Sequence, residues 1–275
     1  MPMVNWFVPL AALLGLIVGG VVNWLADYLP YTARLGLPSY PDGTARPRSA
    51  WLGLSAFLLG RRSSPSGAAL SLRHPLTEIG VAALFAYIAS ESAQDALRAF
   101  FLMGNVAILA LITIIDLEHR MILYLVIVPS CLYALLGAAL LNERLVPNLR
   151  FSDYLLGGAV GFGLFFVMYL GGLLFNYIAS NARGAPITES AFGDGDVLLA
   201  TLAGFMLGWQ ALIYAVMIAV FAGGLGAFLY LSLRMLIRGR YEWFTALPYG
   251  QYIVLGTLIM LLWRAEVLAF FGVRF

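Results

Sequence analysis

Long apolar stretches recur along nearly the whole chain and limit what it can fold into. Several are close to 20 residues long, about the length that an α-helix needs to cross a bilayer core of roughly 30 Å. The 275 residues are 62% hydrophobic and only 11% charged, whereas a soluble domain carries about 25% charged residues. Too few polar side chains remain to cover a soluble surface, so the sequence predicts an integral membrane protein.

The apolar runs predict an all-α, polytopic fold with about eight transmembrane helices. The expected helices cover residues 4–26, 75–95, 98–115, 121–141, 152–180, 196–208, 209–236 and 249–271. The helix at 196–208 is short and could enter only part of the bilayer. The first run lacks a basic segment before Trp6, so it is expected to be a retained anchor rather than a cleaved signal peptide.

One long polar connection, Tyr28 to His74, follows the first helix, and the placement of arginine assigns it to the cytoplasm. Every basic residue is Arg. If the amino terminus lies outside and the helices alternate, the inside loops hold eleven arginines and the outside loops five, which together make the 16 in the chain. Positive charge favours the cytoplasmic side. The inside set is Arg34, Arg46, Arg48, Arg61, Arg62, Arg73, Arg120, Arg183, Arg234, Arg238 and Arg240.

Composition argues against several kinds of site and partner. The formal net charge is +2, which indicates no nucleic-acid partner. Cys131 is the only cysteine, so neither an intramolecular disulfide nor a multi-cysteine zinc site can form. No repeat of the kind found in inverted-repeat transporters is visible. Nothing in the pattern indicates an oligomeric state.

The acidic residues near the apolar runs are informative, because an ionised side chain in hydrocarbon is costly and usually functional. Asp116 and Glu118 directly follow one run, Asp194 and Asp196 directly precede another, and Glu78 lies early in the second expected helix. Under the topology above, Glu78, Asp116 and Asp196 lie toward the cytoplasmic face. The remaining acidic residues, Asp27 among them, fall in loops or at helix ends, where solvation explains them.

Two carboxylates that meet at a partly dry site cannot both ionise cheaply, so one keeps a proton and the other is charged. Such a pair supplies a general acid and a general base, which can activate a water and protonate a peptide carbonyl. The negative end of a helix dipole at Asp116 and the positive end at Asp196 favour Asp116 as the acid. The pair titrates as a unit, so the opposite assignment stays open.

Gly193-Asp194-Gly195-Asp196 is the sharpest local motif. Its glycines let the backbone turn tightly and let a substrate strand approach closely. The alternative is a polar turn that caps the next helix, with Asp as the cap. Spacing alone leaves open which aspartate is catalytic.

Two motifs in this order resemble the prepilin peptidases, the type IV prepilin leader peptidases of the GxGD aspartic protease family. Gly193-x-Gly195-Asp196 before an apolar helix resembles the GxGD motif, and Ile115-Asp116-Leu117-Glu118-His119 resembles the family's other aspartate motif. Three further segments resemble family segments in the same order: Gly19-Gly20-Val21-Val22-Asn23 with Leu29-Pro30, His74-Pro75-Leu76-Thr77-Glu78, and Leu247-Pro248-Tyr249-Gly250.

The resemblance implies a membrane endopeptidase of the bacterial inner membrane that cleaves type IV prepilins or pseudopilins on the cytoplasmic side. It assigns catalysis to Asp116 and Asp196. Asp194, Gly193, Gly195, Glu118 and His119 are expected to support the motifs. His119 either orients Asp116 or is a solvated loop residue. Proteolysis by aspartates needs no cofactor.

Many members of the family also methylate the new amino terminus with S-adenosylmethionine. The resemblance makes Asn23 and Glu78 candidates for that activity, although a helix-packing amide and a membrane-edge carboxylate explain them equally well. The expected division is 1–97 for the anchor, loop and second helix, with a methyltransferase-related role, and 98–275 for the peptidase.

The chain departs from the family at several positions. The connection from Tyr28 to His74 lacks the two Cys-x-x-Cys pairs of many bacterial members, so no zinc is expected. Leu198 stands where many members have Lys, and Leu123-Tyr124 stands where Pro-Asp is common. These differences indicate a divergent branch that keeps both catalytic aspartates.

Three other functions match parts of this pattern. An ion- or proton-coupled transporter would place carboxylates near mid-membrane, whereas here they gather at one face. Another GxGD protease, of the presenilin kind, would have Tyr before its first aspartate, where this chain has Ile115. A catalytically silent assembly factor would keep the fold without the activity, and mutagenesis separates it from an enzyme.

Overall fold

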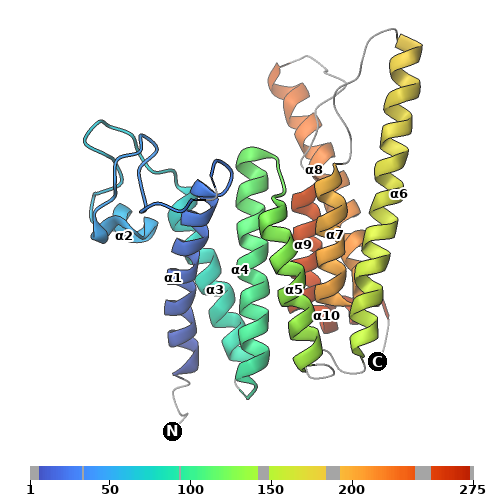
Figure 1. Cartoon of the computed structure of the whole chain (residues 1–275), viewed down its shortest axis with the longest axis horizontal. Coiled ribbons are helices and arrows are strands. Elements are labelled where there is room, and N and C mark those ends of the chain that lie inside the picture. Colours follow the sequence, from blue (N-terminus) through green and yellow to red (C-terminus); the bar gives the residue numbers. More distant parts are fainter. Residues whose placement is uncertain are drawn as a thin grey trace. The chain divides into compact units, whose positions relative to one another are not determined.

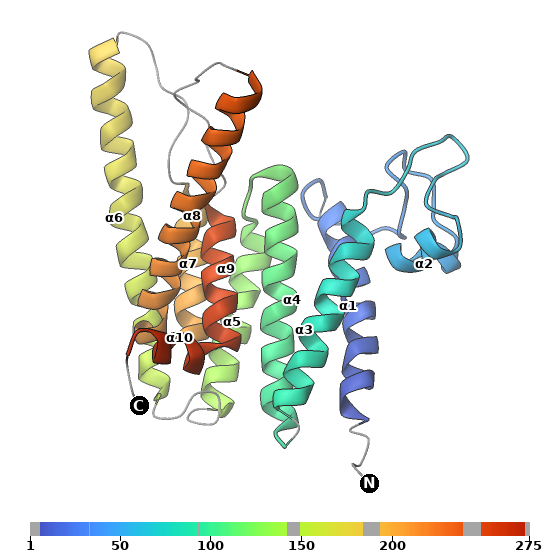
Figure 2. The same ribbon diagram turned by 180° about the vertical axis from the view of Figure 1, so that it is seen from behind.

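The computed structural model describes residues 6–32, 34–92, 94–141, 149–183, 193–238 and 249–272. Over these ranges the regular structure is helical, with no strand beyond two isolated bridges, which confirms the predicted all-α fold. The chain divides into two compact units, Met1–His119 and Arg120–Phe275. The predicted division at 97/98 is a functional one and stays a prediction. Figures 1 and 2 show each unit from opposite sides.

The helices follow the predicted order, and three short elements, η1, α2 and α10, are added to it. The first unit holds α1 (Phe7–Tyr28), the 3-10 turn η1 (Arg48–Ala50), α2 (Gly53–Leu58), α3 (Arg73–Glu91) and α4 (Ala96–His119). The second holds α5 (Tyr124–Leu141), α6 (Phe151–Arg183), α7 (Asp194–Leu207), α8 (Trp209–Arg238), α9 (Gly250–Leu262) and α10 (Arg264–Phe270).

Five of the described helices are long and apolar enough to cross a bilayer: α1, α4, α5, α6 and α8. The bent pair α9–α10 makes a sixth if it counts as one span. These helices confirm an integral membrane protein. The predicted total of about eight spans stays a prediction, because α3 and α7 are not among the helices that meet this test.

In the first unit, α1 packs closely against α3, and α4 lies beside both (Figures 1 and 2). Glycines make the α1–α3 contact close. A Cβ added at Gly15 would lie 2.6 Å from the Cα of Ala82, and one added at Gly19 would lie 2.6 Å from the Cα of Glu78. Both distances are shorter than any real contact, so Gly15 and Gly19 have a packing function here.

The polar connection between α1 and α3 contains two turns of the same construction, a local repeat that the sequence analysis missed. Residues 39–45 read Ser-Tyr-Pro-Asp-Gly-Thr-Ala and residues 63–69 read Ser-Ser-Pro-Ser-Gly-Ala-Ala. Each segment is closed by an antiparallel bridge between its first and last residues. The glycines at position five, Gly43 and Gly67, have φ of 82° and 92°, which favours glycine.

Asp42 in the first turn ties it to the second. Its Oδ2 accepts hydrogen bonds from the hydroxyls of Ser64 and Ser66, and its Oδ1 accepts the N–H of Thr44. The bonds from Ser64 and Ser66, followed by the Thr44 backbone, hold the pKa of Asp42 well below its usual range. The connection is therefore an ordered substructure, with a small core of Tyr40, Ala50, Ala56 and Leu70.

Asp42→Ala is expected to loosen the connection and speed its cleavage by trypsin at the arginines it contains. A lowered folded-state pKa means that the stabilisation is present above the ordinary carboxyl pKa near 3.8 and is lost as the pH falls through the lowered value. The wild-type connection should therefore stay protected down to about pH 4. Timed proteolysis checks this, with Glu266→Ala, an exposed carboxylate in the other unit, as the control. Unchanged cleavage would contradict it.

In the second unit, α7 is short but central (Figure 1), with α5, α6, α8 and α9 packed around it. Glycine again brings backbones together: a Cβ at Gly204 would lie 2.1 Å from the carbonyl oxygen of Gly157 on α6. Gly208, with φ of 76°, ends α7 and allows the chain to turn into α8. A helix of 14 residues can stay apolar without spanning the bilayer because protein surrounds it.

The prediction of a single helix over 249–271 is wrong. The chain bends by 98° at Trp263, between α9 and α10. A contact between distant segments accounts for the bend, since the guanidinium of Arg264 donates a hydrogen bond of 3.2 Å to the carbonyl of Leu207, the last residue of α7. Carbonyls at the end of a helix lack partners within that helix, so a cation that reaches them is stabilising.

Candidate functional site

The first aspartate motif lies at the end of α4. The predicted helix stopped at Ile115, whereas α4 continues to His119, so Asp116 belongs to the helix itself and not to the residues after it. Its side chain is buried, with 8% of the residue exposed. The buried face of α4 also carries Ile112 and Ile115. Asp116 is thus a buried carboxylate near the end of α4.

Glu118 and His119 lie on the same turn and make contacts within the first unit. Arg73 donates to the Glu118 carboxylate at 2.9 Å. The ring of His119 meets the ring of Tyr31 edge to face, with 5.3 Å between centroids. His119 is helical and half-buried, so the expectation of a solvated loop histidine is wrong. Its proposed effect on Asp116 stays a prediction.

The second aspartate motif begins α7. Gly193 is the N-cap, and Asp196 is the third residue of the helix. The Asp196 carboxylate accepts the backbone N–H of Gly193 at 3.1 Å. An acidic residue at this position compensates the unpaired donors and the positive dipole end of a helix. The capping alternative raised from the sequence made an aspartate the N-cap, whereas the N-cap is Gly193 and Asp196 accepts its N–H from the third helical position.

Asp194 differs from Asp196 in its surroundings. It is exposed, and its Oδ2 accepts a hydrogen bond of 2.7 Å from the hydroxyl of Tyr124 on α5. Tyr124 is one of the positions at which the chain departs from the resembled pattern, so the departure has a structural use. An exposed carboxylate already held by a phenol is a poorer proton carrier than the half-buried Asp196. The geometry favours Asp196.

Tyr249 is a neighbour of Asp196 that the sequence analysis did not place in the site. It precedes α9, and α9 packs against α7. Burial, and then the Asp196 carboxylate, raise the pKa of Tyr249. The sequence did contain a signal for this placement, because Tyr249 belongs to Leu247-Pro248-Tyr249-Gly250, the last of the segments that resemble family segments. Leu247 and Pro248 of that segment lie outside the described residues.

The two glycines of the second motif are not equivalent. A Cβ added at Gly195 would lie 2.9 Å from the Cβ of Ile122, whereas the nearest described atom to one added at Gly193 is 3.8 Å away. Gly195 therefore lets the chain before α5 approach the start of α7. Gly193 has ordinary extended dihedral angles, so its conformation does not require glycine.

Gly195→Ala is expected to lower peptidase activity by about tenfold, because the start of α7 must shift to relieve the contact with Ile122. Gly193→Ala, the matched control, should retain more activity. Leader cleavage by equal amounts of membrane-inserted protein measures both. Equal activities would show that the Ile122 contact does not position Asp196.

Asn23 and Glu78, the candidates for methylation, serve as buried connectors in the first unit. The Asn23 amide donates to the backbone carbonyl of His74 at 2.9 Å. Glu78 is fully buried, and its two oxygens accept the backbone N–H groups of Gly53 and Leu54 at 2.6 and 2.7 Å. Glu78 thus holds the first turn of α2. A part in methylation stays a prediction for both residues.

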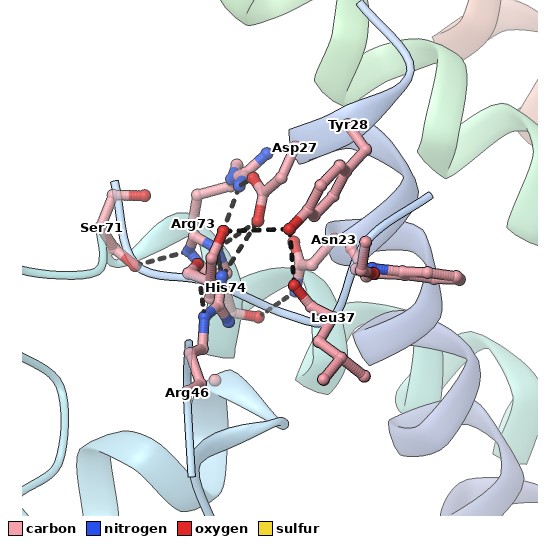
Figure 3. A network of polar contacts seen from close by, with 12 residues as sticks. Asn23, Asp27, Tyr28, Leu37, Arg46, Ser71, Arg73 and His74 are labelled. Carbon is pink, nitrogen blue, oxygen red and sulfur yellow. Dashed lines mark hydrogen bonds and ion pairs between the residues drawn. The ribbon is translucent and has the colours of Figure 1, made fainter. Parts of the chain in front are cut away.

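A polar network around Asp27 was missed entirely by the sequence analysis, which assigned Asp27 to solvent. Asp27 lies in the last turn of α1, where Arg46, Arg73 and His74 converge on its carboxylate (Figure 3). Arg46 comes from the connection and has only 4% of its side chain exposed. No sequence periodicity indicates this cluster, because it joins α1, the loop and the start of α3.

Residues 103–228 match the type IV leader peptidase family. The chain is 25% identical to the prepilin leader peptidase/N-methyltransferase of Stutzerimonas stutzeri, over 96% of this chain and 93% of that protein. It is 25% identical to proteins of the same name from Pseudomonas aeruginosa, over 95% and 92%, and from Pseudomonas putida, over 96% and 93%. No solved structure matches the chain significantly.

In this polytopic helical chain Asp116 is buried near the end of a helix long enough to span a membrane, and Asp196 is half-buried in the first turn of an enclosed helix, an arrangement expected of a membrane aspartic peptidase. The matched region begins in α4 and ends in α8, so it includes both aspartate motifs. Over these residues the chain is similar to the type IV leader peptidase family, and over nearly its whole length it is similar to the three prepilin leader peptidases/N-methyltransferases.

Proposed function

We propose that this protein is a prepilin peptidase, which removes the leader of type IV prepilins or pseudopilins with Asp116 and Asp196 as its catalytic pair. Asp116 belongs to the first unit and Asp196 to the second, so their meeting is part of the proposal. The observation that carries it is the environment of each carboxylate: Asp116 is buried near the end of α4, and Asp196 lies in the first turn of an enclosed helix.

The chemistry follows from a pair that shares one proton. The ionised aspartate takes a proton from a water molecule, whose oxygen attacks the carbonyl carbon of the peptide bond after the leader. The protonated aspartate donates its proton to the carbonyl oxygen. Collapse of the tetrahedral intermediate breaks the C–N bond. The amine leaves with the proton that the first aspartate had taken, and a hydroxyl of the intermediate returns a proton to the second aspartate as the new carboxyl group forms. The pair returns to its starting protonation state, and no metal or cofactor enters.

The site is proposed to face the cytoplasm, with the amino terminus of the protein outside. The eleven-to-five distribution of arginine supports this orientation. Both motifs would then lie at the membrane edge, and a prepilin helix among the helices of the enzyme would present its leader junction there. The expected substrates are prepilins or pseudopilins with a short basic leader.

The protein is further proposed to methylate the new amino terminus with S-adenosylmethionine. The names of the three relatives include an N-methyltransferase, which supports this activity. The lone pair of the neutral amine forms a bond to the methyl carbon, the methyl–sulfur bond breaks with its electrons left on sulfur, and the nitrogen releases a proton to water. Donor and enzyme need no oxidant or reductant.

Coexpression with a type IV prepilin tests the proposal. The membranes of cells that make both proteins should contain a shortened pilin whose amino terminus carries one added methyl group, detected by gel and by mass spectrometry. Cells without this protein supply the control. An unshortened prepilin, across several prepilins, would refute the peptidase, and a shortened but unmethylated pilin would refute the methyltransferase alone.

A further inference from the structure

The short helix α2 lies alongside α1 and α3 and not beyond their ends (Figures 1 and 2). The Glu78 carboxylate accepts the N–H groups of Gly53 and Leu54, and Glu78 stands five residues into α3 (73 to 78), about 7.5 Å along its axis. A Cβ added at Gly20 would meet the side chain of Leu52, and Gly20 stands eight residues before the end of α1 (20 to 28), about 12 Å along its axis. The start of α2 therefore lies roughly 7–12 Å inside the ends of both helices.

This depth is that of the membrane interface. The 22 residues of α1 make a helix of about 33 Å, close to the thickness of a bilayer core of roughly 30 Å, so the end of α1 lies near a membrane surface. An amphipathic helix in the interface buries its apolar face about 5–10 Å into the boundary between headgroups and acyl chains. The outward side of α2 therefore faces this boundary and not bulk water.

The residues around α2 are apolar, and several of their side chains point outward. Trp51 to Leu59 is a run of nine residues without a charge. Trp51 is 41% exposed, Leu58 77% and Leu59 60%. An apolar surface of this kind is costly in water and stable in the interface, where tryptophan is also favoured. The exposure of these three side chains is thus explained by contact with lipid.

The polar groups of this run are already paired within the first unit. The Ser55 hydroxyl donates to the carbonyl of Ser49 at 2.8 Å, and the indole N–H of Trp51 donates to the carbonyl of Arg46 at 3.3 Å. Glu78 takes the first N–H groups of α2. A segment in contact with lipid must satisfy its polar groups internally. The buried Glu78 carboxylate thus allows the start of a short helix to lie at this depth.

Three arginines, Arg48, Arg61 and Arg62, flank the run. All three are exposed, and no salt bridge among the described residues involves any of them. Arg61 donates to the hydroxyl of Ser49, which brings it beside η1, the turn that contains Arg48. Unpaired guanidinium groups at the edge of an apolar surface are suited to the phosphate oxygens of lipid headgroups.

We propose that this surface binds anionic phospholipid and holds the polar connection on the membrane. The apolar side chains enter the boundary between headgroups and acyl chains, and the guanidinium groups contact phosphates. Lipid is the occupant because a surface at this depth is out of reach of a soluble protein. The proposal rests on the membrane-spanning fold and not on the proposed peptidase activity. This interfacial patch consists of Trp51, Leu58, Leu59, Arg48, Arg61 and Arg62.

Fluorescence quenching of the full-length protein in vesicles tests the proposal. A fluorophore is attached at Leu58→Cys in a Cys131→Ala background, and the protein is inserted into phosphatidylcholine alone or into an equal mixture with phosphatidylglycerol. Lipids with brominated acyl chains should quench this fluorophore. Acrylamide in the water should quench it at least about threefold less than a fluorophore at Thr44→Cys, an exposed residue of the first polar turn. Leu59→Cys provides a second position if Leu58→Cys fails to insert.

Replacing the three arginines of the patch tests the role of the headgroup. In the starting protein, phosphatidylglycerol should increase the protection of position 58 from acrylamide, because negative headgroups attract the guanidinium groups. The triple variant Arg48→Gln, Arg61→Gln and Arg62→Gln should lose this dependence on phosphatidylglycerol. The matched control removes three exposed arginines outside the patch and should keep it: Arg34→Gln, Arg120→Gln and Arg150→Gln.

Three results would overturn the proposal. Acrylamide that reaches position 58 as freely as position 44 would show that the patch faces water. Protection from both acrylamide and brominated lipid would assign the patch to a protein, either a second copy or a partner. Quenching by brominated lipid that ignores phosphatidylglycerol would show insertion without recognition of anionic headgroups. Each result can be obtained whether or not the protein cleaves a prepilin, so the proposed peptidase is tested separately.

Discussion

Replacing either Asp116 or Asp196 with asparagine is expected to lower leader cleavage by roughly a thousandfold or more, since each variant loses a group that must carry a proton in the reaction. Asparagine is the informative substitution because it separates catalysis from folding. At Asp196 its side-chain oxygen can still accept the N–H of Gly193, so the start of α7 is kept. Cleavage of a coexpressed prepilin, at equal amounts of membrane-inserted enzyme, measures the loss.

Asp194→Asn is the matched control, two residues away in the same motif. Asp194 is exposed and bonded to Tyr124, so its loss should leave cleavage within about tenfold of wild type. If Asp194→Asn is as inactive as Asp196→Asn, the motif depends on both carboxylates. If Asp116→Asn still cleaves, the pairing is wrong, and Glu118 becomes the next candidate on α4.

Gly204→Val is expected to prevent the second unit from folding, at a cost of about 3 kcal/mol or more. The added side chain would meet the backbone of Gly157, and a backbone cannot move aside as the end of a flexible side chain can. Because α7 also carries Asp196, the loss of α6–α7 packing should remove protein and activity together. The amount of protein in the membrane and its thermal unfolding midpoint measure the effect.

Gly163→Val on α6 is the control for that experiment. A Cβ at Gly163 has open space around it, so valine should be tolerated there. Both variants replace a glycine with valine, so they differ in whether the added side chain meets a neighbouring backbone. Equal levels of the two variants would show that the close approach of Gly157 and Gly204 is not required.

Much of the fold could be predicted from sequence because apolar length alone specifies membrane helices. The apolar runs predicted the order of α1 and of α3 to α9, and the aspartates at the helix ends stood out because charge is rare there. The bend at Trp263 could not be predicted. Its cause is the hydrogen bond from Arg264 to Leu207, a contact 57 residues apart along the chain.

The roles of polar residues in the first unit escaped prediction for the same reason. Glu78 was interpreted as either a methylation residue or a carboxylate at the membrane edge, and its contact with α2 was not expected. It is fully buried against α2, a helix of six residues with too little periodicity to detect. Asp27 was assigned to solvent because its partners come from two other segments. Pairings between distant segments decide which acidic residues are buried, and a single sequence does not reveal them.

The packing around α7 has a dynamic consequence. Asp196 closes its first turn onto Gly193, Arg264 holds the carbonyl of Leu207 at its last, and apolar helices enclose it between the two. Local opening of α7 would have to break both hydrogen bonds and the packing of the surrounding helices at once. The amides of α7 should therefore exchange with deuterium far more slowly than the amides of an isolated helix of this length. A catalytic carboxylate on so immobile a support keeps its orientation between turnovers, and the enzyme need not reorganise before each cut.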